Sequence, residues 1–232
     1  MPDAALPGSP RPNAPPLPKG DRDMNPKDIG LFALIAEDYR THDGLFFAQG
    51  FWVLFWHRFG NWRMSVRPRL LRLPLTLIYR TMFKACEWFC GCKLSYNVPV
   101  GRRVRIDHFG GMVLGARSIG SDVILRQNTT LGIASPADLN AKPRIMDRCD
   151  IGAGAVIVGD ITIGPDAVVG ANAVVLTDVP PHHMAVGVPA RIRPRRGVGA
   201  PEAGGDVAGS QGAEREGAGG RPPGPATADA AE

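Results

Sequence analysis

The chain has 232 residues, which is room for one folded domain with long flanking segments. Its 27 Lys and Arg residues outnumber its 22 Asp and Glu residues, and the net charge of +5 suits nucleic acid, an anionic membrane or a phosphorylated ligand equally. No nucleic-acid-binding motif accompanies this charge, so we expect no nucleic-acid partner. Residues 1–23 and 193–232 are rich in Pro, Gly and Ala and nearly lack large apolar side chains, which predicts that both are disordered.

Residues 24–92 have a helical texture, which is clearest over residues 35–40, 50–62 and 75–89. Pro74 suits the first turn of the last of these helices, where its missing N–H leaves no hydrogen bond unmade. The middle helix is dense in aromatic side chains, and we expect it to pack against the first part of residues 93–192 or against a neighbouring subunit.

The segment 75–89 is apolar but carries Arg80, Lys84 and Glu87, so it is too short and too charged to span a bilayer comfortably. A helix that lies on a membrane surface is the alternative. We see no signal peptide at the start of the sequence. The four cysteines form no C-x-x-C pair and resemble small core residues of a reduced protein. We therefore expect a cytoplasmic protein without integral membrane association.

A six-residue period is the strongest pattern in the chain. Aliphatic residues recur at Ile145, Ile151, Ile157, Ile163, Val169 and Val175, and a small or aliphatic residue stands two positions before each following one. This period is neither the 3.6 of a helix nor the two of a flat strand. It indicates a β-helix of hexapeptide repeats, in which each unit supplies one short strand and one turn. Three units make a coil, and stacked aliphatic side chains form a continuous core.

The same spacing extends backwards, with interruptions. It includes Leu94, Val100, Ile106 and Met112 and then, after one inserted residue, Ile119, Leu125 and Leu131. A gap of fourteen separates Leu131 from Ile145, which predicts that residues 132–144 form a loop outside the coil. Such loops on a rigid scaffold often bind ligands, although a tolerated surface insertion is the alternative. We expect a mainly β protein, with a helical region at 24–92 and a β-helix at 93–192.

His108 is the candidate for chemistry among the five histidines. It follows Asp107 and lies two residues after an aliphatic position, at a turn or an outer face of the coil. A neutral imidazole there could accept a proton from a hydroxyl that attacks a thioester, whereas a surface histidine is the alternative. Gly110 and Gly111 favour the first interpretation, since they let a ligand come close. We predict no metal site, because three converging histidines are absent from the repeats.

Several stretches resemble known proteins. They are 101–108 and 111–115, with the Asp-His pair; 129–132, before the loop; 151–155 and 169–175, in the repeats; and 178–181 with 186–191, at the end of the coil. Together they resemble the hexapeptide-repeat acyltransferases, and most closely the serine O-acetyltransferases. The resemblance implies a left-handed parallel β-helix, a homotrimer or a dimer of trimers, and acetyl-CoA as co-substrate.

The resemblance also implies roles around the acceptor. Acetyl would pass directly from acetyl-CoA to the hydroxyl of L-serine, the first step of cysteine biosynthesis from serine. His108 would be the general base and Asp107 would help to hold the serine ammonium group. Asp43 is a loose match to a second serine-binding carboxylate, and Lys142 keeps a positive charge where the family binds the serine carboxylate.

On the acetyl-CoA side, the resemblance assigns four positions. Gly132 would border the acyl group. Ala153 and Ala171 match small positions along which the pantetheine arm runs. Arg191 would meet the adenosine phosphates.

Departures from the family pattern fall around the acceptor. Lys93 replaces a carboxylate that orients the catalytic histidine, Ser95 replaces a histidine, and Ala141-Lys142 replaces an Arg-His pair. The alternative function is therefore acetyl-CoA-dependent O-acetylation of a sugar or an exopolysaccharide precursor. A non-catalytic scaffold is a third interpretation, which His108 and the coenzyme A positions disfavour.

Overall fold

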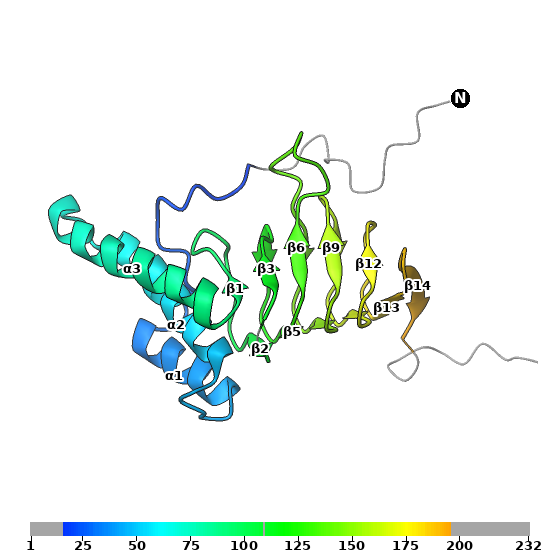
Figure 1. The fold of residues 1–232 in the computed structure, drawn as a ribbon, viewed down its shortest axis with the longest axis horizontal. Coiled ribbons are helices and arrows are strands. Elements are labelled where there is room, and N and C mark those ends of the chain that lie inside the picture. Colours follow the sequence, from blue (N-terminus) through cyan, green and yellow to red (C-terminus); the bar gives the residue numbers. More distant parts are fainter. Residues whose placement is uncertain (1–15, 109, 196–232) are drawn as a thin grey trace, which may run out of the picture. The chain divides into compact units, whose positions relative to one another are not determined.

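The helices and strands follow one another in two blocks along the chain. A computed structural model describes residues 16–108 and 110–195. Its helical elements, shown at the blue and cyan end of Figure 1, are α1 (Leu31–Thr41), α2 (Gln49–Trp62), the short 3-10 helix η1 (Arg63–Ser65) and α3 (Arg69–Phe89). Short β-strands occupy the rest of the described chain, so the fold is mainly β with a helical N-terminal region, as predicted.

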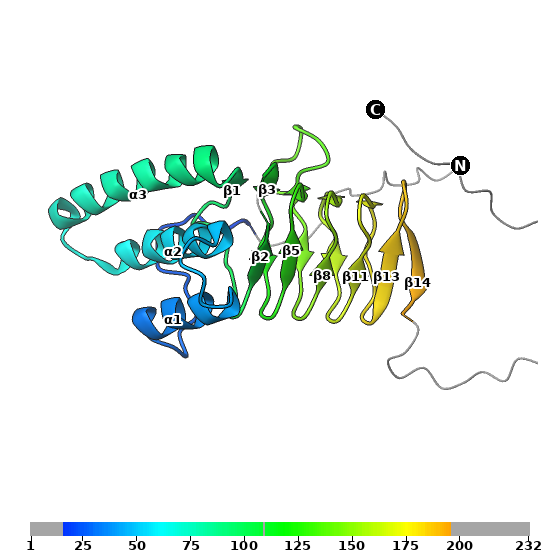
Figure 2. The ribbon, with the colours of Figure 1, turned by 60° about the horizontal axis from the view of Figure 1, so that its bottom comes forward.

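The strands form three sheets, which the chain visits in turn (Figures 1 and 2). Sheet A contains β1 (Cys92–Lys93), β3 (Met112–Leu114), β6 (Thr130–Gly132), β9 (Val156–Val158) and β12 (Val174–Val175). Sheet B contains β4 (Ser118–Ile119), β7 (Arg144–Ile145) and β10 (Thr162–Ile163). Sheet C contains β2 (Arg105–Asp107), β5 (Ile124–Arg126), β8 (Asp150–Ile151), β11 (Val168–Val169), β13 (His183–Val186) and β14 (Arg191–Pro194).

Every strand pair in these sheets is parallel except β13 with β14. Because the chain passes from sheet C to A to B and back to C, successive layers of a three-sided coil lie one above the other. The aliphatic residues of the six-residue period point inward: Ile145, Ile151, Ile157, Ile163, Val169 and Val175 are all almost completely buried. This burial of apolar surface is the main stabilising contribution to the coil.

The interruption before Ile119 differs from the sequence prediction. Val113 pairs with Thr130 and Leu114 with Leu131, so Leu114, and not Met112, occupies the inward position of its layer. Met112 is also buried, because alternate residues of a strand face the same side. Met112 stands six residues after Ile106 and so fits the period, whereas Leu114 stands eight residues after it, and the period alone therefore misplaced the insertion.

Buried polar contacts connect α2 to the first layer of the coil. The Arg58 guanidinium pairs with Asp38 of α1 at 2.9 Å, and both side chains are fully buried. Arg58 also donates to the carbonyls of Val100 (2.8 Å) and Gly101 (2.6 Å), and His57 Nε2 donates to the carbonyl of Val98 at 2.9 Å. The helical region is thereby held in one position against the coil.

Three local expectations need correction or restriction. Helix α3 begins at Arg69, so Pro74 lies inside it rather than in its first turn. Gly20 is buried and its carbonyl accepts a hydrogen bond from Tyr96, so the expected disorder of residues 1–23 does not hold there. Strand β14 continues past residue 192, because it pairs with β13. The rest of the predicted disorder, at 1–15 and 196–232, lies outside the described residues. No described helix is long and apolar enough to cross a membrane.

Candidate active site

His108 lies at the corner where the chain leaves sheet C for sheet A. Asp107 pairs with Arg126 of the next layer. The backbone N–H of Asn128 donates to the Gly110 carbonyl at 2.9 Å, and one layer further along the N–H of Gly154 donates to the Gln127 carbonyl in the same way. Gly110 and Gln127 therefore occupy equivalent positions. Two residues separate Asp107 from Gly110, whereas none separates Arg126 from Gln127. His108 is the first of these two extra residues.

The insertion displaces His108 from the regular wall of the coil. Its side chain is exposed and its φ is 61°. Histidine is among the non-glycine residues that adopt this left-handed conformation more readily. Gly110 and Gly111 follow with φ of 109° and 64°, which residues with a Cβ rarely adopt. The two glycines thus serve the insertion that presents His108, a more specific role than the close approach expected from the sequence.

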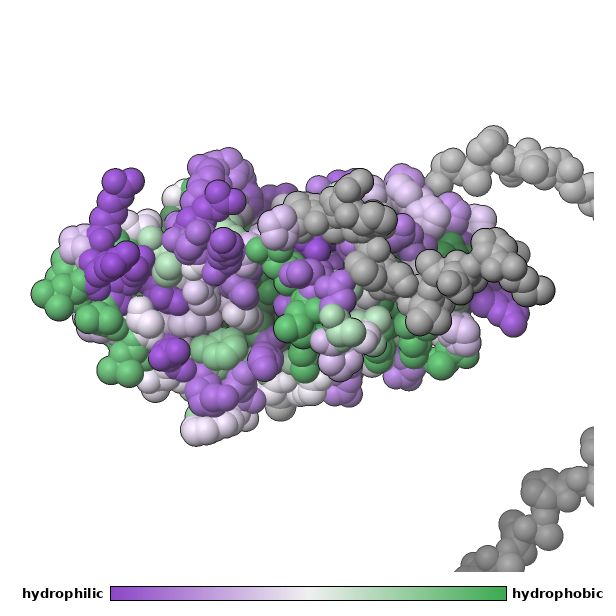
Figure 3. Space-filling view, turned by 90° about the horizontal axis from the view of Figure 1, so that it is seen from above, coloured by the Kyte–Doolittle hydropathy of each residue, from purple (hydrophilic) through white to green (hydrophobic). Residues whose placement is uncertain are grey.

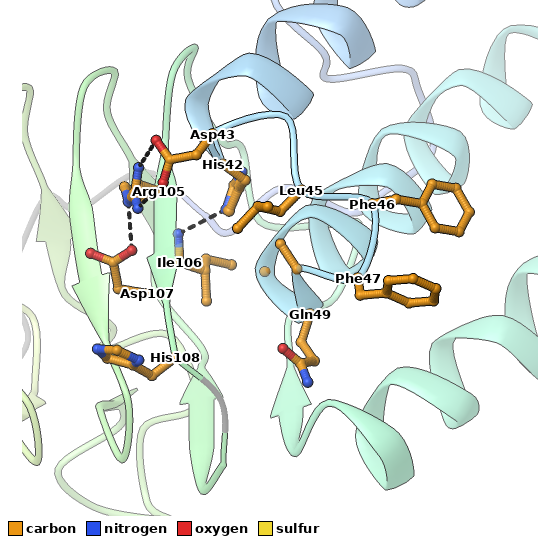
Figure 4. A pocket seen from close by; sticks show the side chains of 12 residues that line it. His42, Asp43, Leu45, Phe46, Phe47, Gln49, Arg105, Ile106, Asp107 and His108 are labelled. Carbon is orange, nitrogen blue, oxygen red and sulfur yellow. Dashed lines mark hydrogen bonds and ion pairs between the residues drawn. The ribbon is translucent and has the colours of Figure 1, made fainter.

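A cavity of about 460 Å³ adjoins this corner. One wall is β2 with His108, and the other is the connection between α1 and α2. Figure 4 shows Asp43, Arg105, Asp107 and His108 along one side, with Phe46 and Phe47 further away. The structure therefore brings together three predicted site residues, Asp43, Asp107 and His108, although Asp43 lies far from the other two in sequence.

Arg105 links the two carboxylates of the cavity. Its Nε donates to Asp107 Oδ1 at 2.5 Å, and its Nη1 and Nη2 donate to the two Asp43 oxygens at 3.1 and 2.7 Å. The hydrogen bond from Arg105 is the main reason that the pKa of Asp43 lies below its ordinary value. Two carboxylates and one guanidinium leave a net negative charge, which favours a ligand with a cationic group.

Sequence reasoning missed Arg105 and His42. Arg105 stands two residues before Asp107 on one strand, so both side chains face the same side, and this spacing was the available signal. The His42 ring lies 2.7 Å, at Nδ1, from the Asp38 carbonyl, to which it donates, and its Nε2 accepts from the Ile106 N–H at 3.2 Å. Burial lowers the pKa of His42, which keeps it neutral in this structural role.

Three of the positions assigned to acetyl-CoA lie along the edge of the coil that begins at His108. Ala153 and Ala171 occupy the same corner in successive layers, since the Asn172 N–H donates to the Ala153 carbonyl at 2.8 Å. Arg191 follows the corresponding corner of the next layer and is exposed. Because Ala153 is half-buried and Ala171 exposed, small side chains leave this edge open to an extended ligand. We call it the donor edge.

Gly132 and Lys142 lie at a different edge. Gly132 ends β6, at the far end of sheet A from the His108 corner, and the loop that contains Lys142 follows it. A Cβ built on Gly132 meets no atom within 4 Å, so space is open beside it. Ala141 is 3% exposed and offers no side chain to a ligand. Within one chain, these two positions do not join the cavity at His108.

No carboxylate is hydrogen-bonded to the His108 ring within the described residues. Lys93 lies on β1 and pairs with Val113, beside the strand that follows the His108 corner. The same described residues contain no cluster of three or more His, Cys, Asp or Glu side chains that could hold a metal ion.

Comparisons with known proteins identify the family of the chain. Residues 142–177 match the family model of the bacterial transferase hexapeptide (six repeats). The serine acetyltransferase of Escherichia coli K12 is 35% identical over 177 residues, which are 72% of this chain and 62% of that protein. The chain thus spans about three fifths of its length.

Solved structures give the same result. A soybean serine acetyltransferase apoenzyme is 31% identical and has a TM-score of 0.59. The match covers 70% of this chain and 69% of the soybean chain. A soybean serine acetyltransferase complexed with serine is 26% identical, with a TM-score of 0.59, over 75% of this chain and 81% of that one. On this identity and coverage, the chain belongs to the serine acetyltransferase family.

Proposed function

We propose that the protein is a serine O-acetyltransferase that transfers acetyl from acetyl-CoA to the hydroxyl of L-serine, as in cysteine biosynthesis. The observation that carries the proposal is the cavity in which Asp43, Asp107 and His108 meet at the start of the donor edge. The names of the relatives support the same reaction, and one solved relative is a complex with serine.

In this mechanism His108 acts as the general base. Its neutral imidazole takes the proton of the serine hydroxyl as the oxygen attacks the thioester carbonyl carbon of acetyl-CoA. The C–S bond then breaks, the acetyl group stays on the serine oxygen, and the imidazolium returns the proton to the leaving sulfur. Exposure of His108 on a two-residue insertion allows both substrates to reach its ring.

The acceptor would be held by its charges. An ammonium group between Asp43 and Asp107 would neutralise the negative charge that Arg105 leaves unbalanced. Lys142 would meet the serine carboxylate. Acetyl-CoA would follow the donor edge past Ala153 and Ala171 to Arg191, and it supplies the activated acetyl group.

We further propose a left-handed coil and a homotrimer in the cytoplasm. The donor edge and the edge with Gly132 and Lys142 are separate within one chain. Packing the loop edge of one subunit beside the donor edge of the next would bring Gly132 and Lys142 toward His108. A closed threefold ring makes this contact three times. Pairing of two trimers is the alternative assembly.

Specific observations favour a second acceptor class, the hydroxyl of a sugar. Lys93 stands at the family's carboxylate position, and the buried Ala141 cannot replace the arginine of the family's Arg-His pair. Arg105 already engages both cavity carboxylates. The loss of the Arg-His pair and the Arg105 contacts both affect recognition of an amino acid, whereas a sugar needs only hydrogen bonds and a base.

The test is release of free CoA from acetyl-CoA with L-serine or with a panel of sugars and nucleotide sugars. His108→Ala is compared with His182→Ala, because His182 is also an exposed histidine with a positive φ, of 58°. We expect turnover with serine, retained in the His182 variant and lost by at least about a hundredfold in the His108 variant. Turnover with a sugar alone would support the second acceptor, and full activity of His108→Ala would refute the mechanism.

A further inference from the structure

A second cavity, of about 480 Å³, lies between η1, α3 and the segment after β1. Its lining residues are Arg63, Met64, Arg69, Arg72, Leu73, Thr76, Tyr79, Arg80 and Tyr96. Four of these are arginines and none is acidic. The cavity shares no lining residue with the one at His108.

Arg63 is the innermost charge of this cavity. It is 5% exposed, and its guanidinium carbon lies 4.7 and 4.5 Å from the ring centroids of Tyr79 and Tyr96. Its Nη1 donates to Thr76 Oγ1 at 3.2 Å, but its buried Nε has no hydrogen-bond partner in the described part of the chain. The Thr76 hydrogen bond and the two aromatic rings offset only part of the hydration free energy that a buried guanidinium without a carboxylate loses.

The other three arginines come from one face of α3. Arg69, Arg72, Thr76 and Arg80 stand three or four positions apart along α3, so their side chains project to the same side. Across residues 16–108 and 110–195, none of the three forms a salt bridge with a carboxylate. Like charges held together repel one another. The arrangement therefore has a place for an anion, which would relieve both the repulsion and the cost of burying Arg63.

We propose that this cavity binds a phosphate group of a phosphorylated ligand. Guanidinium groups match phosphate oxygens with paired, charge-assisted hydrogen bonds, and several arginines around one cavity suit a doubly charged group. The cavity volume is typical of sites for small organic ligands and exceeds the needs of a bare phosphate ion. The bound molecule is thus a phosphate ester.

The phosphate ester has two possible sources. One is a soluble organic phosphate. The other is a phospholipid headgroup, because α3 exposes Leu70, Leu71 and Leu77 near the arginines. Figure 3 shows exposed hydrophobic residues beside hydrophilic ones at the left end of the molecule, which α3 forms in Figure 1. The experiment separates these two sources.

Binding is measured by titration calorimetry on the full chain, with inorganic phosphate, pyrophosphate and ADP as probes at matched ionic strength. Acetyl-CoA and acceptor are omitted, so the result is independent of the transfer reaction. The variants are Arg72→Gln/Arg80→Gln and Arg69→Gln/Arg80→Gln, and the second changes exposed residues only. Arg67→Gln is the matched control, since Arg67 is exposed nearby but does not line the cavity.

We expect saturable binding to the wild type and the Arg67 variant, weakened on the order of tenfold or more in both double variants. In parallel, sedimentation with phosphatidylglycerol or phosphatidylcholine vesicles identifies a lipid source if binding needs the anionic lipid and the same arginines. The proposal is overturned if neither soluble probes nor anionic vesicles bind. It is also overturned if the folded double variants bind as well as the wild type does.

Discussion

Replacing Gly50 by alanine tests whether the contact between α2 and β2 determines the geometry of the cavity at His108, which we call the acceptor cavity. A Cβ on Gly50 would lie 2.2 Å from the Ile106 carbonyl oxygen and 2.9 Å from His42 Nε2. Non-bonded carbon atoms prefer separations of about 3.5 Å or more, so helix and strand must separate by about 1 Å. The obstructing oxygen belongs to the backbone and cannot rotate away.

This displacement acts on both walls of the cavity. Gly50 and His42 belong to one wall, whereas Ile106 is followed directly by Asp107 and His108 of the other. Overpacking of this kind costs about 1–3 kcal/mol of folding free energy. A shift of about 1 Å between reacting groups lowers the rate on the order of a hundredfold. We therefore expect a large loss of kcat/KM together with a moderate loss of stability.

The assay compares kcat/KM and urea unfolding for Gly50→Ala and Gly30→Ala. Gly30 precedes α1 with a φ of −72°, and a Cβ there meets no atom within 4 Å. Alanine is a poorer residue than glycine at a helix start, so the control loses up to about 1 kcal/mol while its activity remains. If Gly50→Ala kept the activity of the wild type, the contact would not control the cavity and the reasoning would be wrong.

Three further predictions concern other parts of the molecule. Burial lowers the pKa of His57 to about 3, so the unfolded chain binds a proton below about pH 6.5 while the folded chain does not. The free energy of unfolding should then decrease as the pH is lowered from 6.5 toward 3, by about 2 kcal/mol at pH 5. Urea unfolding should show a smaller decrease in the His57→Gln variant than in the wild type. Ala171→Leu should raise the KM for acetyl-CoA about tenfold or more with little change in the thermal unfolding temperature, because a larger side chain blocks the donor edge. An unchanged KM would contradict the proposal that acetyl-CoA binds along this edge. Lys93→Asp, which restores the carboxylate of the family pattern on an exposed strand residue, should raise kcat with serine. A lower kcat would show that Lys93 itself is needed.

The repeat made most of the coil predictable, because every sixth residue has the same environment in each layer. The inward positions from Ile145 to Val175 and the position of the loop follow from this regularity. The layer that contains Leu114 departed from the prediction, since Met112 is buried on the same face of the strand. An insertion beside two such residues leaves the apolar pattern almost unchanged, and only strand pairing reveals it.

The acceptor side was harder to predict, because it combines segments that are distant in sequence. Asp107 and His108 were identified as neighbours, but the Arg105 contact with Asp43 spans 62 residues. The buried Gly20, reached by Tyr96 from 76 residues away, is a similar case. Such contacts depend on how the helices rest on the coil, and no local pattern records that placement.

The donor edge and the acceptor cavity depend on different features of the chain. The donor edge consists of repeated corners whose backbone hydrogen bonds maintain the path whatever the outward side chains are, provided that Ala153 and Ala171 remain small. The acceptor cavity instead depends on side chains from the α1–α2 connection and from β2. Substitutions there alter charge and shape without disturbing the buried core. Changes at Asp43 or Arg105 should therefore change the choice of acceptor while the KM for acetyl-CoA stays constant, and a parallel loss of both would contradict this separation.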